Sequence, residues 1–295
     1  MKSVISKVVE GLMELTTLKV FIAVAEAGGV SPASERLHCV QSNVTARIKK
    51  LEEELGVALF MRKSRGMELS AQGRVLLEHA YQIVDMERQA KRAVNASLED
   101  GGSLSLGSME TAMAVRLPSL LKEFHHLHPK TELSVRTGTT DEMITQVLNH
   151  QLDCAIVGST VKSEEIIQYP FFTERLVLVS APGKEASKTL LVYRKGCAYR
   201  ARAEEWLRHE GRLPYTIMEF GTQEGIVGCV SAGLGVTILP IEVAKTLSAE
   251  LTITDLPEDI ARVETFLICH KSTVQTKPMQ TLMNLATRYS AVQAA

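Results

Sequence analysis

Residues 31–55, with the sequence SPASERLHCVQSNVTARIKKLEEEL, decide how the N-terminal part of this chain folds. The stretch predicts two helices joined by a tight turn. Ser31 is expected to be the N-cap of the first helix and Pro32 its first residue, because both residue types favour those positions. That helix is expected to end near His38, and the second to begin near Val40 or Gln41.

The second helix has an apolar face and a polar, cationic face. Four apolar residues spaced +4, +3 and +4 share one side of it: Val44, Ile48, Leu51 and Leu55. The other side carries no carboxylate before Glu52 and consists of Gln41, Asn43, Thr45, Arg47, Lys49 and Lys50. Such a helix pair is the motif that enters the DNA major groove, where Gln, Asn, Thr and Arg read base edges. A solvated amphipathic helix pair shows the same pattern. The flanking residues are therefore needed to distinguish a DNA-binding motif from such a pair.

The flanking segments complete a winged helix-turn-helix. Residues 15–27 (LTTLKVFIAVAEA) have apolar side chains at helical spacing, which predicts a supporting first helix. Gly56 is expected to end the second helix of the motif, before an apolar plug that reaches Phe60. Residues 62–69 (RKSRGMEL) predict a basic two-stranded wing that turns at Gly66. Its cations would meet phosphates, which position a protein on DNA: Arg62, Lys63 and Arg65.

Residues 15–73 resemble the DNA-binding domain of the LysR-type transcriptional regulators. The matching motifs are VFIAVAEAG, the helix that ends in ERL, QSNVTARIKKLEEELGVALFMR and LSAQG. Many family members have Ser-Gln-Pro where this chain has Val-Gln-Ser at 40–42, so the cap hydroxyl moves to Ser42. The resemblance implies a domain at 13–71, a helix-turn-helix at 31–50, and operator DNA as partner. The expected DNA contacts are Ser31, Gln41, Ser42, Asn43, Thr45, Arg47, Lys50, Arg62, Lys63 and Arg65.

Composition limits the class of protein. The chain has 295 residues, 45% hydrophobic and 23% charged, which fits a globular protein of two or three domains. Its net charge is −1, so the positive charge is local: residues 40–65 carry six Lys or Arg against three Glu. Five cysteines without a C-x-x-C pair argue against zinc and disulfides, and favour a reducing cytoplasm. We find no membrane-spanning run and no signal peptide, and expect residues 1–12 to be an extension or an upstream start.

A long helix is predicted after the wing. Ser70 is expected to cap it, and it runs from Ala71 to about Leu98; as a domain we assign residues 72–99. Apolar residues alternating +4 and +3 form a seam with one charged position: Leu76, Ala80, Ile83, Glu87, Ala90 and Val94. A solvated spacer helix is the alternative. In the LysR family the corresponding helix makes a dimer, and residues 100–103 then form a linker.

From Leu104 the sequence alternates strands and helices, which predicts a parallel sheet covered by helices. One helix is expected over residues 111–127, and strands include residues 176–180 and 264–269. The motifs LSLGSMETAMAVRLPSLLKEFHHLHP, QLDCAIVG, LVLVSAP and CVSAGLGVTILP resemble the LysR effector domain. That implies an α/β, two-lobed fold like that of periplasmic binding proteins. Lobe I would comprise residues 101–174 and 262–295, and lobe II residues 175–261, with a ligand cleft between them.

The resemblance places the cleft at loops that open helices. The residues expected to bind the effector are Ser108, Met109, Glu110, Thr111, Thr139, Thr140, Cys197, Tyr199 and Thr222. Free N–H groups at helix starts suit an anionic or strongly polar ligand, and Arg200 and Arg202 lie beside Cys197. Each Ser or Thr could instead be only a helix cap. Cys197 is either a small packed side chain or, at a helix start beside arginines, a reactive thiol.

The sequence thus predicts an effector-controlled transcriptional regulator, a homodimer through the long helix and, by resemblance, a homotetramer. The alternatives are a cytoplasmic solute-binding protein or cleft enzyme of two-lobed fold, and an architectural DNA protein without a ligand. No nucleophile–base pair is apparent, so no enzyme activity is expected. No cofactor is expected, and the histidines near Pro129 fit no metal signature.

Overall fold

The computed structural model describes residues 13–63, 66–95, 102–211, 214–247 and 250–293. The chain divides into two compact units, residues 1–91 and 92–295, and each is considered by itself. Residues 1–12, Arg65 and the expected end of the long helix at 96–99 lie outside the described residues.

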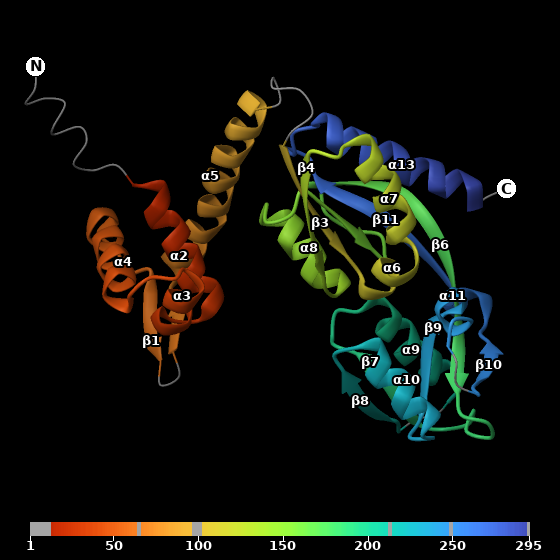
Figure 1. The fold of residues 1–295 in the computed structure, drawn as a ribbon. Helices are drawn as coiled ribbons and strands as arrows, with labels where there is room; N and C mark the ends of the chain where they lie inside the picture. The colour runs from red at the N-terminus through yellow and green to blue at the C-terminus, as the bar shows by residue number, and fades with distance from the viewer. Residues whose placement is uncertain (1–12, 64–65, 96–101, 212–213, 248–249, 294–295) are drawn as a thin grey trace, which may run out of the picture. The chain divides into compact units, whose positions relative to one another are not determined.

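The N-terminal unit opens with three helices, α2 (Leu15–Ala27), α3 (Val30–Arg36) and α4 (Gln41–Leu55) (Figure 1). Their buried apolar side chains form one core, whose centre comprises Leu18, Phe21, Val24, Ala33, Val44, Ile48 and Leu51. The sequence predicted all three helices and most of this core. Because α3 and α4 carry narrow apolar faces, both pack on α2 and leave their polar sides exposed.

Three details of the helix-turn-helix differ from the prediction. Ser31 is not an N-cap: α3 begins at Val30, two residues before the predicted Pro32, with Gly29 at the cap position and no side-chain cap. Ser42 supplies no cap to α4 either, which begins after Val40 with no side-chain cap hydrogen bond. Leu55 is 40% exposed rather than part of the core, and it is the last residue of α4 before the left-handed Gly56.

The wing consists of β1 (Phe60–Lys63) and β2 (Gly66–Leu69), paired antiparallel from Phe60 opposite Leu69 to Lys63 opposite Gly66. Gly66 therefore begins the second strand. The wing is fixed to the turn after α2, because the Met67 amide donates to the carbonyl of Gly28 at 2.9 Å. A Cβ on Gly66 would stand 2.6 Å from that carbonyl oxygen, so only glycine allows this approach.

The long helix α5 (Ala71–Asn95) starts as predicted, with the Ser70 hydroxyl accepting the Gly73 amide at 2.9 Å. Part of the predicted seam packs inside this unit: Ala80 is fully buried and Leu76 packs on the same core. Glu87 forms an ion pair with Lys19 of α2 at 2.7 Å, and its Lys19 and Lys91 partners lower its pKa to about 2. Three residues of the predicted seam stay exposed: Ile83, Ala90 and Val94.

The C-terminal unit contains a mixed sheet in the order β4-β3-β5-β11-β6-β9-β7-β8, with β10 on β6. One half comprises β3 (Gly102–Ser108), β4 (Thr131–Thr137) and β5 (Cys154–Val157). The other comprises β7 (Thr189–Tyr193), β8 (Thr216–Phe220), β9 (Val236–Pro240) and β10 (Thr252–Asp255). The strands β6 (Ile166–Ser180) and β11 (Arg262–His270) join the halves, so the unit has two lobes connected by two crossing strands (Figure 1).

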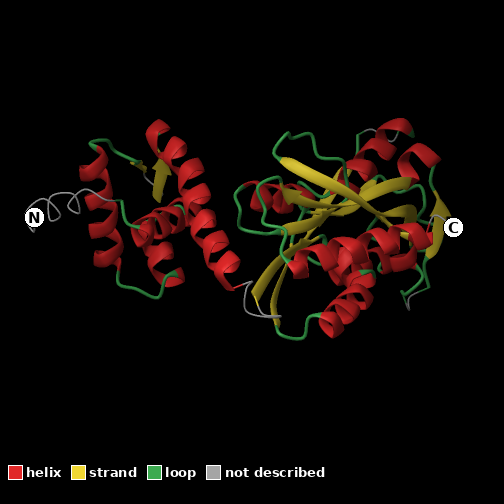
Figure 2. Cartoon of the chain, turned by 90° about the horizontal axis from the view of Figure 1, so that it is seen from above, coloured by secondary structure: helices red, strands yellow, loops and turns green. Residues whose placement is uncertain are grey.

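Helices cover both faces of each half (Figure 2). In the first lobe α7 (Leu117–Leu127) and α13 (Lys277–Gln293) pack on one side and α8 (Thr140–Leu148) on the other. In the second lobe α9 (Ala198–His209) lies opposite α10 (Gln223–Ser231) and α11 (Ile241–Ala244), and α12 (Glu258–Ala261) packs on α9. No helix within the described residues is long and apolar enough to cross a membrane.

Three predictions for this unit were wrong. The sheet is not wholly parallel, because β11 pairs antiparallel with both β5 and β6. The strand expected at 176–180 is the end of the 15-residue β6. The helix expected over 111–127 is two helices, α6 (Glu110–Val115) and α7, which break at Arg116 because Pro118 follows and cannot donate the helical hydrogen bond.

Candidate functional site

The DNA-binding candidates on α4 form an exposed surface. Asn43 and Lys50 project from it, and Gln41 donates to the Ser31 hydroxyl at 3.0 Å, which joins the two helices of the motif. Arg47 is half-buried and donates to Asn43 Oδ1 at 3.1 Å and to Thr16 Oγ1 at 3.2 Å. The remaining candidates on this surface are exposed: Ser31, Ser42 and Thr45.

Glu14, which sequence reasoning missed, lies on the same surface. Its carboxylate forms ion pairs with Lys50 Nζ at 3.0 Å and Arg47 Nη1 at 3.7 Å. The hydrogen bond from Lys50 and its charge lower the pKa of Glu14. The carboxylate therefore partly neutralises two cations of this surface. The only sequence signal was its place just before the first helix.

The wing candidates are only partly described. Arg62 and Lys63 lie in β1, where their backbone pairs with Met67 and Gly66. Arg65 lies outside the described residues. The strand pairing thus places Arg62 and Lys63 on the hairpin that the sequence predicted.

A cavity of about 300 Å³ lies between the two lobes of the C-terminal unit. Eight of the nine predicted effector residues line it: Met109, Glu110, Thr111, Thr139, Thr140, Cys197, Tyr199 and Thr222. Ser108 does not, because its side chain is fully buried and donates to the Met109 carbonyl at 2.9 Å. Additional lining residues are Thr137, Gly138, Tyr193, Arg194 and Gly221, which also end strands or follow them. The lobes thus bring together loops that are more than a hundred residues apart.

The cleft hydroxyls accept backbone N–H groups. Thr139 caps α8 in a capping box with Glu142, and Thr222 caps α10 by accepting the Gly225 amide at 3.2 Å. Thr140 accepts the Gly158 amide at 3.4 Å. A hydroxyl that accepts such a bond keeps its own O–H as a donor, so these groups can serve both as caps and as ligand donors.

Two charged side chains line the cavity. Partial burial raises the pKa of the Glu110 carboxyl, while the Gln223 backbone N–H lowers it. Arg194, from the second lobe, forms an ion pair with Glu142 of the first at 3.6 Å. The Tyr193 hydroxyl is buried without a hydrogen-bond partner among the described residues, which leaves a polar atom at the cavity wall.

A buried hydrogen-bond network joins the cleft to a crossing strand. Tyr199, 2% exposed, donates to the carboxyl of Glu174 on β6 and accepts the Thr111 hydroxyl at 3.1 Å. Burial raises the pKa of Glu174 to about 7, against the hydrogen bond from Tyr199 and the charge of Arg116, which lower it. Sequence reasoning named Tyr199 and Thr111 but missed Glu174, since nothing in the local pattern marks it as buried.

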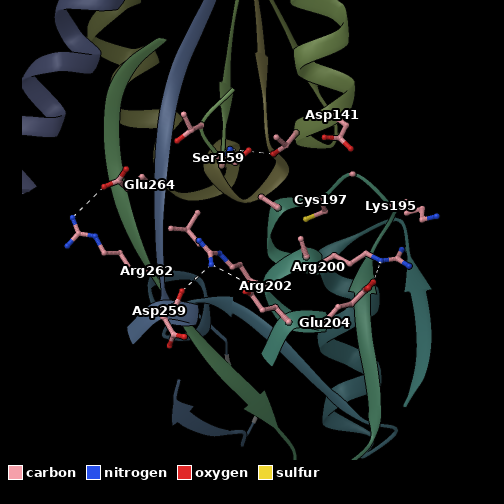
Figure 3. A pocket seen from close by; sticks show the side chains of 18 of the residues that line it. Asp141, Ser159, Lys195, Cys197, Arg200, Arg202, Glu204, Asp259, Arg262 and Glu264 are labelled. Carbon is pink, nitrogen blue, oxygen red and sulfur yellow. Dashed lines mark hydrogen bonds and ion pairs between the residues drawn. The ribbon is translucent and has the colours of Figure 1, made fainter. Parts of the chain in front are cut away.

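A second interlobe cavity of about 780 Å³ shares Thr140 and Cys197 with the first (Figure 3). Its arginines are engaged with acidic partners: Arg200 with Glu204 at 2.8 Å and Glu219 at 2.6 Å, and Arg202 with Glu205 at 3.3 Å. Both arginines thus line an interlobe cavity with acidic partners at hand, and their role toward an anion stays a prediction. The side chains of Arg200 and Arg202 are 12% and 37% exposed, and their guanidinium groups lie beside these carboxylates (Figure 3).

Cys197 is the N-cap residue of α9, as the sequence predicted. Burial raises the pKa of its thiol, against the backbone N–H groups of Arg200 and Tyr199 that lower it. The thiol form is therefore favoured, and the interpretation as a small packed side chain fits better than a reactive thiolate.

Comparison with known proteins agrees with this arrangement. Residues 15–74 match the bacterial regulatory helix-turn-helix protein of the lysR family, and residues 98–291 match the LysR substrate binding domain. The chain belongs to the LysR family. It is a DNA-binding transcriptional regulator with an effector-binding domain.

Two curated relatives match this chain over nearly its whole length. The uncharacterized HTH-type transcriptional regulator YusT of Bacillus subtilis (strain 168) is 42% identical over 279 residues, 92% of this chain and 95% of YusT. The HTH-type transcriptional regulator SoxR of Arthrobacter sp. (strain TE1826) is 42% identical over 275 residues, 91% of this chain and 94% of SoxR.

A solved structure of a LysR-type protein on DNA has a similar fold. Full-length CbnR complexed with its target DNA superimposes with a TM-score of 0.65 at 25% identity, covering 94% of this chain and 100% of CbnR. The order of winged domain, long helix and two-lobed domain is therefore that of the family.

Proposed function

We propose that a small molecule bound in the 300 Å³ interlobe cavity controls how this regulator binds its operator. The observation that carries the proposal is that hydroxyl-bearing loops of both lobes line one cavity. A ligand that contacts both lobes favours one lobe arrangement over another, and only such differential binding can shift the protein between states. Lobe boundaries at 174/175 and 261/262 are supported by the pairing of Arg175 with Arg262 on the crossing strands.

The proposed DNA contacts are the exposed α4 side chains and the wing cations. Gln41, Asn43 and Arg47 read base edges, while Lys50 and the wing residues Arg62, Lys63 and Arg65 meet phosphates. The hydrogen bonds from Arg47 to Asn43 and Thr16 hold its guanidinium in place before DNA arrives. This pre-organisation lowers the entropy that the side chain loses on binding.

The cavity favours a polar ligand with hydrogen-bond acceptors at one end. Thr139, Thr140 and Thr222 have hydroxyl protons to donate, and the cation of Arg194 attracts a carboxylate. Glu110 would accept from a hydroxyl or ammonium group of the ligand. The ligand class that meets both requirements is an amino acid or hydroxy acid, whereas the wall of Met109 and Tyr199 accommodates a short apolar part.

Thr139→Val should weaken ligand binding by about 1–3 kcal/mol, because it removes a hydroxyl and leaves a ligand atom unpaired. The measurement is calorimetric titration with a panel of amino acids and hydroxy acids, paired with operator binding. Thr139→Ser is the matched control, because it keeps the hydroxyl that caps α8. We expect Thr139→Ser to bind like the wild type and both variants to bind the operator unchanged without ligand. Loss of basal operator binding in Thr139→Val with intact ligand affinity would show that this loop supports assembly instead.

We propose a homodimer through α5 and, from the family architecture, a homotetramer. The exposed side chains of α5 that align on one side of the helix are Val75, His79, Ile83, Met86, Ala90 and Val94. Met86 is 63% and Val75 59% exposed. A helix with such a stripe buries it against a second copy of itself. The stripe keeps Ile83, Ala90 and Val94 of the predicted seam, whereas Leu76 and Ala80 pack inside the unit.

Ile83→Asp should convert the dimer to a monomer at micromolar concentration, since it places a charge in an apolar seam between two helices. Light scattering measures the assembly. Glu78→Lys, an exposed charge change away from the stripe, is the control and should leave the dimer intact. A wild-type protein that is already monomeric, or an Ile83→Asp variant with unchanged mass, would refute the assembly.

The proposed location is the cytoplasm, where operator DNA and a reducing environment for the five cysteines are found. We also propose that the protein is not an enzyme. Two titratable groups of the cavity, Glu110 and Cys197, accept hydrogen bonds from backbone N–H groups, and burial raises the pKa of the Cys197 thiol, which disfavours a nucleophilic thiolate.

A further inference from the structure

The end of α2 joins three parts of the N-terminal unit. Glu26, in the last turn of α2, accepts from the Tyr81 hydroxyl of α5 at 2.9 Å through Oε1. Its Oε2 accepts from Nη1 of Arg36, the last residue of α3, at 2.5 Å. The first residue after the helix, Gly28, holds the wing by accepting the Met67 amide. We call Glu26, Arg36 and Tyr81 the α2 junction, and the proposed DNA contacts include none of the three.

A second polar contact joins α2 to α5 further along both helices. Lys19 Nζ of α2 lies 2.7 Å from Glu87 Oε2 of α5. Along α2, Lys19 comes seven positions before Glu26, whereas along α5 Glu87 comes six positions after Tyr81. The contacts thus follow in opposite order, so the two helices run antiparallel over this stretch. At a rise of 1.5 Å per residue, the two contacts are about 10 Å apart.

The polar contacts restrict α5 more than its apolar packing does. Leu76 and Ala80 pack on the core of the unit, but burial of apolar surface is non-directional and tolerates small changes of angle. A hydrogen bond has a preferred distance and direction, so two polar contacts at different points fix how α5 lies along α2. Tyr81 is 8% exposed, and burial and the charge of Glu26 raise the pKa of its phenol. The hydroxyl therefore keeps the proton that it donates.

We propose that the α2 junction determines which spacing of two operator half-sites this regulator accepts. The inference rests on the proposed homodimer through α5. In that dimer each α5 carries its own α3 and α4, so the angle between α5 and the helix-turn-helix sets the distance and rotation between the two copies of α4. Each base pair added between half-sites rotates one against the other by about 35°. A fixed junction therefore rejects spacings that a loose junction tolerates, and Glu26 is a positioning residue that acts through α3 and α5.

The test uses the full-length protein and an operator recovered by genomic footprinting. Anisotropy titrations compare this operator with duplexes in which one or two base pairs are inserted or removed midway between the half-sites. Tyr81→Phe keeps the buried ring and removes the hydroxyl, and Lys19→Met keeps the apolar stem and removes the charge of the second contact. We expect the wild type to bind the changed spacings at least tenfold more weakly than the operator. In each variant this ratio should fall at least threefold, and it should fall further in the double variant.

Two readouts separate positioning from a general weakening of the fold. Single base changes inside a half-site should cost Tyr81→Phe as much affinity as they cost the wild type, because the side chains of α4 are unchanged. Gln82→Ala, at the exposed neighbour of Tyr81 on α5, is the matched control and should keep the wild-type spacing ratio. Circular dichroism checks that each variant is folded.

The inference is overturned if Tyr81→Phe and the double variant keep the wild-type spacing ratio, or if base preference declines together with spacing preference. A wild type that is monomeric in light scattering would overturn the proposed homodimer and this inference together. A dimeric wild type that binds all spacings equally would overturn this inference alone.

Discussion

Arg47→Ala is expected to weaken operator binding by about 1–3 kcal/mol and to relax the base preference at one position, because a guanidinium that reads a base edge contributes that much. The side chain is poised for this role, since Asn43 and Thr16 hold it on the surface of α4. The measurement is anisotropy titration of an operator recovered by genomic footprinting, together with duplexes changed at single positions. Lys63→Ala should instead weaken all sequences alike, as loss of a phosphate contact does.

Glu14→Gln tests the same surface in the opposite direction. It removes the carboxylate that holds Lys50 and Arg47, so both cations become available and binding to every duplex should tighten, more at low salt than at high salt. Arg47 would lose its place among the base-reading residues if Arg47→Ala bound the operator with wild-type affinity. It would be reassigned to phosphate if its loss weakened scrambled and operator duplexes equally.

The second large effect is expected from Glu174, the buried carboxyl of the crossing strand β6 that accepts from Tyr199. Its pKa is about 7 in the folded protein against 4.5 for an ordinary glutamate, so the folded state binds more protons between those values. Stability must therefore fall as pH rises through this window. The total loss for one group is about 3 kcal/mol, at about 1.4 kcal/mol for each pKa unit.

Glu174→Gln should remove this loss, because the amide resembles the protonated acid and still accepts from Tyr199. Denaturant unfolding followed by Trp206 fluorescence reports this unit alone, since that tryptophan lies in α9. The informative quantity is the difference between variant and wild type at pH 5 and pH 8, which cancels other titrating groups. Glu132→Gln, an exposed change on β4, should run parallel to the wild type. Parallel curves for Glu174→Gln would contradict a raised pKa.

The sequence was sufficient for features that depend on neighbouring residues. The periodicity of residues 41–55 predicted α4 and its polar surface, and Ser70 predicted the start of α5. Most of the cleft was located by the resemblance to the LysR effector domain, which places it at loops that open helices. Eight of the nine residues named from that resemblance line the cavity.

Only the tertiary structure decided which groups meet across long distances in sequence. Glu14 reaches Lys50 over 36 positions and Tyr199 reaches Glu174 over 25, and no local spacing encodes either pair. The same holds for Arg200, which pairs with Glu219 over 19 positions. The spacing of apolar residues along the sequence indicates which side of a helix or strand is buried. Hydrogen bonds and ion pairs, in contrast, form only between side chains that packing has already brought together.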